Sequence, residues 1–130
     1  HNKKKIYEIK FSWNKKEYKK NKEMILFFSF KLSYKPVNLI IGVPIWSENG
    51  DIVTGVSSKM NDINIKPSSD GIYQGKVVLK NIFYPGKYIN VLSIYDGQEA
   101  LFREIDKFES IYNKNQFFAH IIPEHTWDIK

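Results

Sequence analysis

The sequence has no cysteine among its 130 residues. This absence excludes a disulfide framework, a thiolate metal site and a cysteine nucleophile. It suits a cytoplasmic protein, but secreted domains without cysteine exist as well, so the compartment stays open on this ground. The stability of the fold must therefore come from its core and its hydrogen bonds.

Long hydrophobic runs are also absent, because no stretch approaches the ~18 to 20 consecutive apolar residues of a membrane-spanning helix. The N-terminal letters HNKKK are not followed by the apolar segment of an export signal. We therefore expect neither an anchored protein nor an exported precursor. Because the chain starts without Met, we expect either a piece of a longer protein or a mature chain with an added remnant at His1.

Residue patterns for catalysis are scarce. The seven glycines stand singly, whereas a phosphate-binding loop needs them closely spaced before a helix, and the three histidines lack the spacing of a zinc site. Glu104 and Asp106 would share a strand face at the separation of glycosidase acids, but the interleaved Arg103 and Lys107 favour a solvated charged strand. We predict a non-catalytic domain with no metal and no cofactor.

Positive charge is concentrated at one end of the chain. The net charge is +6, and residues 1–31 contain ten Lys against three Glu, so the remainder is close to neutral. Such a patch suits nucleic acid, anionic lipid or an acidic polymer, but a lysine-rich surface without any function explains it at least as well. Lys greatly exceeds Arg, and no recognition helix or aromatic ladder accompanies it, so we predict no nucleic-acid partner.

Apolar residues alternate with polar ones along most of the chain, which is the period of a half-buried β-strand. The clearest strand is 24–34, with Met24, Leu26, Phe28, Phe30 and Leu32 on its apolar face. Further strands are predicted at 5–12, 39–46, 52–56, 72–79, 88–95, 100–108 and 117–122. Turn signals such as Asn49-Gly50 and Pro85-Gly86 separate them.

Seven or eight strands without βαβ alternation predict one all-β domain over residues 1–130. We expect an antiparallel two-sheet β-sandwich of immunoglobulin-like or jelly-roll topology. Residues 14–23 are polar with almost no apolar stripe, so we interpret residues 1–23 as a basic first hairpin with a partly mobile connection. The polar loop at 57–70 is expected to line a site.

Aromatic residues are abundant: three Trp, eight Tyr and nine Phe are more than a core of this size readily absorbs. Exposed rings offer flat apolar faces to the C–H sides of sugars, while adjacent amides, hydroxyls and ammonium groups bind the sugar hydroxyls. The alternative is an ordinary solvated sheet surface. On the faces opposite the predicted core, the candidate carbohydrate-binding residues are Ser29, Lys31, Trp46, Gln74, Lys76 and Asn90, with Ser93 as the alternative to Asn90. Lys31 and Lys76 would suit an anionic substituent.

Two stretches of the chain and its end resemble a known family. The residues concerned are GVPI at 42–45, NGDIV at 49–53, YPGKY at 84–88, IYDG at 94–97 and HTW at 125–127. From about residue 27 onward they resemble the C-terminal carbohydrate-binding domain of the ATPase subunit of bacterial polysaccharide-exporting ABC transporters, the Wzt type. The Pro-Gly-x-Tyr turn also occurs in unrelated immunoglobulin-like sandwiches.

The resemblance implies recognition of a lipid-linked polysaccharide such as O-antigen, including its modified end, so that the glycan is exported. It implies an ATPase domain before residue 1, a transmembrane partner subunit, and a location at the cytoplasmic face of the membrane. It also implies a homodimer formed by exchange of a terminal strand, for which 117–122 is the candidate. The insertion at 14–23 departs from the family pattern, and no binding residue is transferred by position.

Two other functions stay open at this point. The chain could be an immunoglobulin-like protein-interaction or adhesion domain, for which an exposed apolar edge strand would be the sign. It could also be an accessory domain of a glycoside-processing enzyme.

Overall fold

The computed structural model describes residues 4–60, 63–111 and 126–129. Within them the chain forms eight strands and no helix: β1 (Ile6–Trp13), β2 (Glu17–Lys19), β3 (Glu23–Leu32), β4 (Leu39–Ser47), β5 (Ile52–Ser57), β6 (Ile72–Lys80), β7 (Gly86–Asp96) and β8 (Glu99–Ile111). Seven of them confirm predicted strands, while β2 was not predicted. The strand predicted at 117–122 lies outside the described residues.

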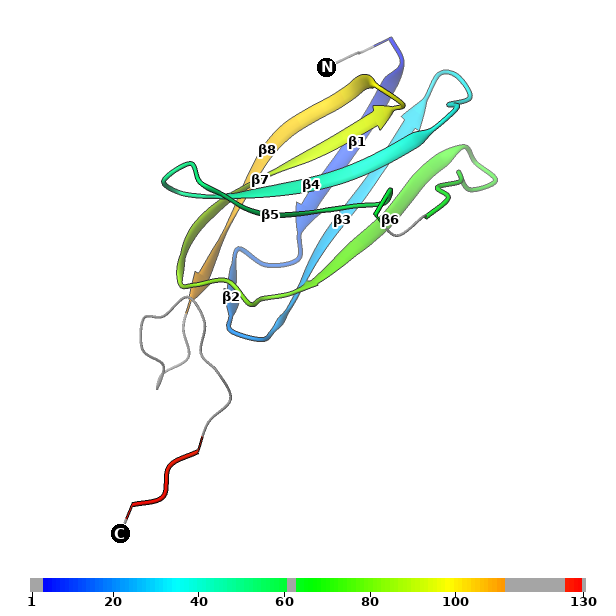
Figure 1. Cartoon of the computed structure of the whole chain (residues 1–130). Coiled ribbons are helices and arrows are strands. Elements are labelled where there is room, and N and C mark those ends of the chain that lie inside the picture. Colours follow the sequence, from blue (N-terminus) through cyan, green and yellow to red (C-terminus); the bar gives the residue numbers. More distant parts are fainter. Residues whose placement is uncertain (1–3, 61–62, 112–125, 130) are drawn as a thin grey trace.

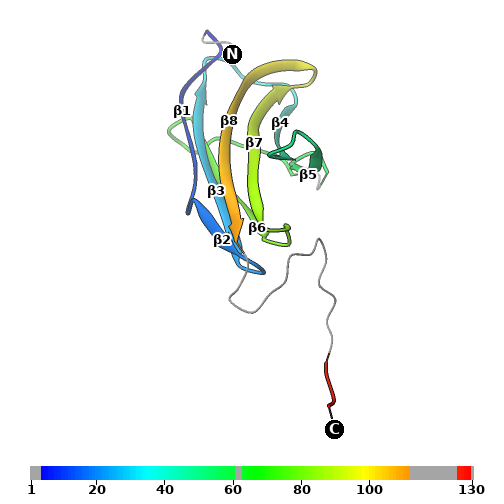
Figure 2. The ribbon, with the colours of Figure 1, turned by 90° about the vertical axis from the view of Figure 1, so that its left-hand side faces the viewer.

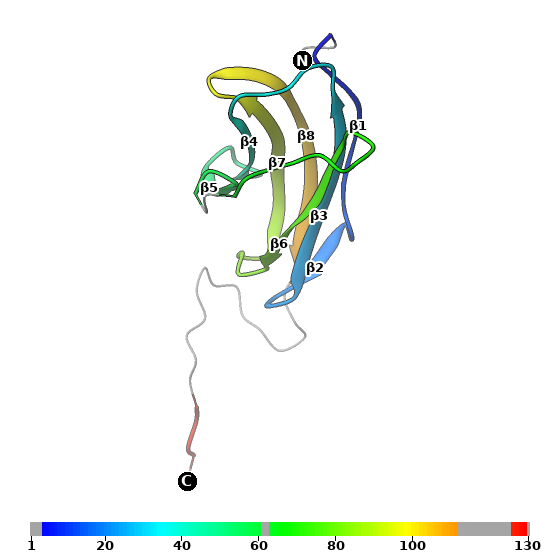
Figure 3. The ribbon, with the colours of Figure 1, turned by 90° about the vertical axis from the view of Figure 1, so that its right-hand side faces the viewer.

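The strands form two sheets packed face to face (Figure 1). One sheet has the order β1-β3-β6, and the other has the order β2-β8-β7-β4-β5. The pairs are antiparallel except β2 with β8, which is parallel. Figures 2 and 3 show β1 and β3 in one layer, beside the layer of β8, β7 and β4. The predicted all-β sandwich is confirmed.

The core between the sheets comes from the apolar faces that alternation predicts. Met24, Leu26 and Phe30 of β3 are buried, and Ile41 and Ile45 of β4 are buried opposite them. One end of the core is an aromatic cluster around Phe108, whose ring centroid lies 5.2 Å from that of Trp13 and 5.3 Å from that of Tyr88. Burial of such rings supplies much of the hydrophobic free energy of folding.

The connection between β1 and β3 contains a buried residue, contrary to the prediction of an exposed polar loop. Tyr18 is only 2% exposed, and its ring packs against Trp13 and Phe108. Its hydroxyl donates a hydrogen bond to Asn14 Oδ1 and accepts one from the backbone N–H of Lys15. A single tyrosine leaves no periodic signal, which is why the alternation pattern missed it.

β1 contains a bulge that changes which of its residues face the core. Its register against β3 shifts between Tyr7 and Lys10, and Glu8 has a φ of 53°. Ile6 is buried before the bulge, whereas Phe11 and Trp13 face the core after it. A single alternation through residues 5–12 would place Ile6 on the outer face with Lys10, and Tyr7 on the core face with Phe11. It is wrong at both Ile6 and Tyr7, because Ile6 is buried and Tyr7 is exposed. After the bulge, Lys10 and Ser12 point to the outside of the sandwich.

Candidate functional site

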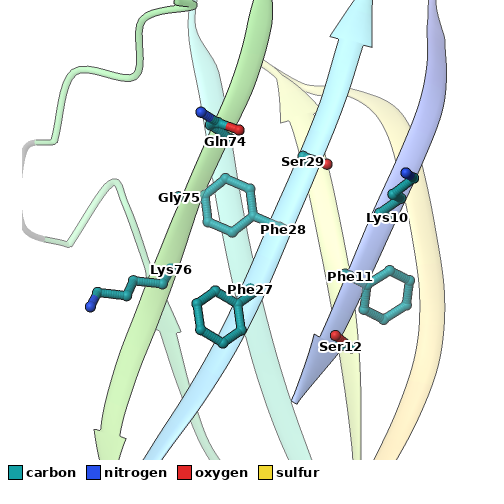
Figure 4. A pocket seen from close by; sticks show the side chains of 9 residues that line it. All are labelled: Lys10, Phe11, Ser12, Phe27, Phe28, Ser29, Gln74, Gly75 and Lys76. Carbon is teal, nitrogen blue, oxygen red and sulfur yellow. The ribbon is translucent and has the colours of Figure 1, made fainter. Parts of the chain in front are cut away.

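The outer face of the three-stranded sheet carries a shallow recess of about 460 Å³ (Figure 4). Its lining residues are Lys10, Phe11 and Ser12 of β1, Phe27, Phe28 and Ser29 of β3, and Gln74, Gly75 and Lys76 of β6. All three strands of the sheet therefore contribute to one surface.

The strand registers place six of these side chains in two rows across the sheet. Lys10 pairs with Ser29, which pairs with Gln74. Ser12 pairs with Phe27, which pairs with Lys76. Neighbouring strands lie about 4.8 Å apart and alternate residues along a strand about 6.7 Å apart, so the two rows form one compact patch.

Phe27 supplies the apolar centre of this patch. Its side chain is 46% exposed, and it belongs to the central strand of the sheet, so other side chains surround it. Figure 4 shows its ring between Lys76 on one side and Ser12 on the other. An exposed ring bordered by hydroxyl, amide and ammonium groups can pack against the C–H face of a sugar while the polar groups bind its hydroxyls.

The row between these two rows faces the core and supports the patch. A Cβ atom placed on Gly75 would lie 3.0 Å from Phe28 Cζ, so the glycine is what allows the Phe28 ring to sit there. Phe28 stacks on Phe30, and Phe30 stacks on Tyr73 at a centroid distance of 5.2 Å and an interplanar angle of 4°. The recess therefore rests on a stack of rings.

The lysines of this face differ in their partners. Lys31 Nζ lies 3.0 Å from Glu8 Oε2, and this hydrogen bond raises the pKa of Lys31. Within the described part of the chain, Lys10 and Lys76 have no carboxylate within ion-pair distance. Glu8 neutralises the charge of Lys31, whereas the two lysines that line the recess, Lys10 and Lys76, keep their free positive charge.

Four of the six candidate residues lie on this face, and their use as binding residues stays a prediction. Ser29, Gln74 and Lys76 line the recess, while Lys31 lies one row further along β3 and pairs across the strands with Tyr7 and Ile72. These residues share one face because each occupies a predicted outward position on β3 or β6, and the two strands pair with each other.

Trp46 faces outward as expected, but it belongs to the other sheet. It lies on β4 and pairs with Ile89 of β7 and Ile52 of β5. A sandwich has two outer faces, and alternation along a strand does not say to which sheet the strand belongs. Trp46 is therefore not the aromatic residue of the recess.

Asn90 lies in the core, so its prediction as a surface binding residue is wrong. Its side chain is 0% exposed, and its Oδ1 accepts a hydrogen bond of 2.8 Å from the indole N–H of Trp13. β7 is a central strand with Val91, Leu92 and Ser93 also buried, so alternation could not separate its two faces. The alternative residue, Ser93, is buried and donates a hydrogen bond to Gly42 O.

Among the six outward residues of the recess, Phe27, Lys10 and Ser12 are the ones that the sequence analysis did not select. A signal existed for Phe27, because it occupies an outward position of the clearest strand between two other outward positions. Lys10 and Ser12 also occupy outward positions of their predicted strand, but alternation does not say that this strand pairs with β3.

Two kinds of group or element are absent from the described residues, and a third is absent from the recess. They contain no group of three or more His, Cys, Asp or Glu side chains that could hold a metal ion. In the same part of the chain, we find no helix with the length and apolar character needed to cross a membrane. The recess itself has no carboxylate in its lining.

The fold and the recess define a β-sandwich domain with one open polar and aromatic sheet face. No protein-family model matches the sequence, and no curated protein matches it. The fold is similar to that in the crystal structure of the C-terminal domain of wzt, with a TM-score of 0.75 over 100% of this chain and 87% of that chain, at 15% sequence identity. This agrees with the family resemblance found in the sequence.

A second solved structure is more distant. It is a β-glucosidase from Listeria innocua, with a TM-score of 0.48, 9% identity, and coverage of 82% of this chain and 16% of that chain. We draw nothing from it about activity.

Proposed function

We propose that this chain is a non-catalytic glycan-binding module and that the outer face of the three-stranded sheet binds the sugar. The observation that carries the proposal is Phe27, which is 46% exposed at the centre of a recess lined by Ser12, Ser29 and Gln74. Exposure of a phenylalanine ring to water is energetically unfavourable. A sugar ring packed on it would reduce that exposure, with hydroxyl and amide partners already in place.

The proposed ligand is a lipid-linked bacterial polysaccharide, recognised with its modified end for export by an ABC transporter. The module would be joined to an ATPase domain and would work with a transmembrane subunit at the cytoplasmic face of the membrane. Support comes from the fold shared with the C-terminal domain of wzt and from the motifs at 42–53 and 84–97 that resemble this family.

The proposed assembly is a homodimer formed by exchange of residues 117–122. Support comes from the sequence of this segment, FAHII after Phe117, which is apolar and follows a polar link. The described residues also present apolar side chains to solvent on the five-stranded sheet, among them Ile52 and Ile105.

The experiment that tests glycan binding compares two aromatic residues on opposite outer faces. We expect Phe27→Ala to weaken binding to a bacterial O-antigen by at least about tenfold, because it removes the apolar surface on which the sugar packs. Trp46→Ala is the matched control and should leave the affinity unchanged. Titration calorimetry measures both, with circular dichroism to verify folding. Equal affinities of Phe27→Ala and the unaltered chain would exclude this face as the binding surface.

A specific observation favours a second function, binding of a protein partner. β5 is an edge strand, and its Ile52 and Val53 are exposed, Ile52 to 70%. An exposed apolar edge strand can accept a strand from another chain. If glycans of every class fail to bind, a loss of protein association in Val53→Lys would support this alternative.

A further inference from the structure

We propose that the recess selects glycans carrying an anionic substituent, a carboxylate or a phosphate, placed between or beside Lys10 and Lys76. This inference rests on the proposed function and names the class of sugar that the same site takes. It depends on the difference between Lys31 and the two lysines that line the recess.

Lys10 and Lys76 lie at opposite corners of the patch. Lys10 is on β1 in the row of Ser29, and Lys76 is on β6 in the row of Phe27. From the strand spacing and the rise along a strand, their Cα atoms are roughly 12 Å apart, which is longer than one pyranose ring. A glycan packed on Phe27 would therefore lie between the strand positions of the two lysines, whose long side chains could reach it from either side.

Of four hollows on the described surface, the recess has the largest excess of lysines over carboxylates. A neighbouring hollow also contains Lys76 and no carboxylate, but it has no second lysine. The recess contains two lysines and no carboxylate. The hollow beside β1 and β8 contains Glu8 and Glu104. The hollow at the start of β7 and the end of β8 contains lysines together with Glu48, Asp106 and Glu109. Only unpaired charge attracts an anion strongly, because an existing ion pair must first be broken.

Lys31 is a lysine on the same face whose charge is paired with a carboxylate. It is bonded to Glu8 at 3.0 Å, and Asp70 and Tyr7 also act on it electrostatically. It is thus a natural internal control, since it shares the sheet face and the residue type of Lys76 but not its free charge.

The test uses pairs of glycans that differ only in charge. One pair is a uronate-bearing bacterial polysaccharide before and after chemical reduction of its carboxylates to primary alcohols. The other is a phosphate-bearing polysaccharide before and after phosphatase treatment. Affinities are measured by titration calorimetry at low and high salt, and we expect the charged member of at least one pair to bind about tenfold more tightly at low salt. The pair that responds identifies the anion.

Three variants assign the preference to its residues. Lys10→Gln with Lys76→Gln should remove the preference for the charged member, with about a threefold loss per lysine, while binding of the neutral member stays the same. Lys31→Gln should keep the preference. Glu8→Gln should increase it, because it frees the charge of Lys31.

The outcomes separate this inference from the proposed function. Equal binding of charged and neutral members would overturn the anion preference and leave glycan binding intact. A preference that survives Lys10→Gln with Lys76→Gln would overturn the assignment to these lysines. Absence of binding to every glycan would overturn the proposed function and this inference with it. Equal binding to poly-L-glutamate, which has no sugar ring, would reduce the effect to charge alone and would also overturn it.

Discussion

At the scale of single residues, Asn81 is the most connected polar side chain of the core. It is fully buried, and its Nδ2, which has two N–H donors, lies within hydrogen-bond distance of Tyr18 O, Lys19 O and Ser110 Oγ, while its Oδ1 accepts a hydrogen bond from Phe83 N. It thereby joins β2 and β8 to the segment that follows β6. A buried polar group is favourable only when its bonding capacity is met, as it is here.

We predict that Asn81→Ala lowers the free energy of unfolding by about 2 to 4 kcal/mol, because it leaves several buried polar groups without partners. Urea denaturation measures this. Asn64→Ala, at an exposed asparagine, is the control and should change stability by less than about 0.5 kcal/mol. A similar small effect at Asn81 would show that the bonds around it are replaceable.

We expect the stability of the folded state to depend on pH through Asp96. Its carboxylate accepts hydrogen bonds from the backbone N–H groups of Val37 and Asn38 and from the Tyr34 hydroxyl. The backbone bond from Asn38 is the main cause that lowers the pKa of Asp96. Burial, followed by the bond to Asp96, raises the pKa of Tyr34.

Because the pKa of Asp96 is lower in the folded state, its stabilising effect is present above the unfolded pKa of about 3.9 and is lost as the pH falls through the folded value. We predict that Asp96→Asn lowers stability by about 1 to 2 kcal/mol at neutral pH and by less below about pH 3. Thermal unfolding across this range measures it. Asp51→Asn, at an exposed carboxylate, should follow the unaltered chain, and a parallel shift of Asp96→Asn at every pH would contradict the assignment.

At the scale of elements, the sequence predicts the strand positions, most core faces and the two-sheet sandwich. It does not predict which strands belong to which sheet. Alternation identifies Met24 and Leu26 as core residues because a half-buried strand repeats every second residue. The same pattern is silent on which strands share a sheet, so Trp46 was grouped with residues that lie on the other face. It also fails in β7, where both faces are buried, and this is why Asn90 was misplaced.

The contact between β3 and β6 at Gly75 gives a prediction at this scale. Gly75→Ala should lower stability by about 1 to 2 kcal/mol, because the new Cβ meets Phe28 Cζ at 3.0 Å and displaces the ring from its stack. Chemical denaturation measures this loss of stability. Glycan binding should also weaken, because the displaced Phe28 is adjacent in sequence to Phe27. Phe28→Leu makes room, so the double variant should lose less than the sum of the single variants. Strict additivity would show that the two residues do not interact.

At the scale of the whole molecule, all eight described strands lie before residue 112. If residues 117–122 exchange between two chains, sedimentation equilibrium should give a dimer for the full chain. A chain ending at residue 111 should keep its circular dichroism spectrum and sediment as a monomer. The same dimer mass without these residues would exclude strand exchange and would direct attention to the apolar surface at Ile52 and Ile105.

If the recess binds an anionic glycan as proposed, the bulge in β1 affects which ligands it accepts. Glu8 is the one residue by which β1 exceeds a regular ladder with β3, since the paired residue numbers sum to 38 before the bulge, as for Tyr7 with Lys31, and to 39 after it, as for Lys10 with Ser29. Removing that residue would restore an even ladder and would also remove the counter-ion of Lys31. A single deletion would thus add a cation to the sheet face without substituting any lysine. Under the proposed function, the length of one strand would therefore influence the charge of the ligand, and related chains with and without the extra residue would be expected to differ in the acidity of the glycans they bind.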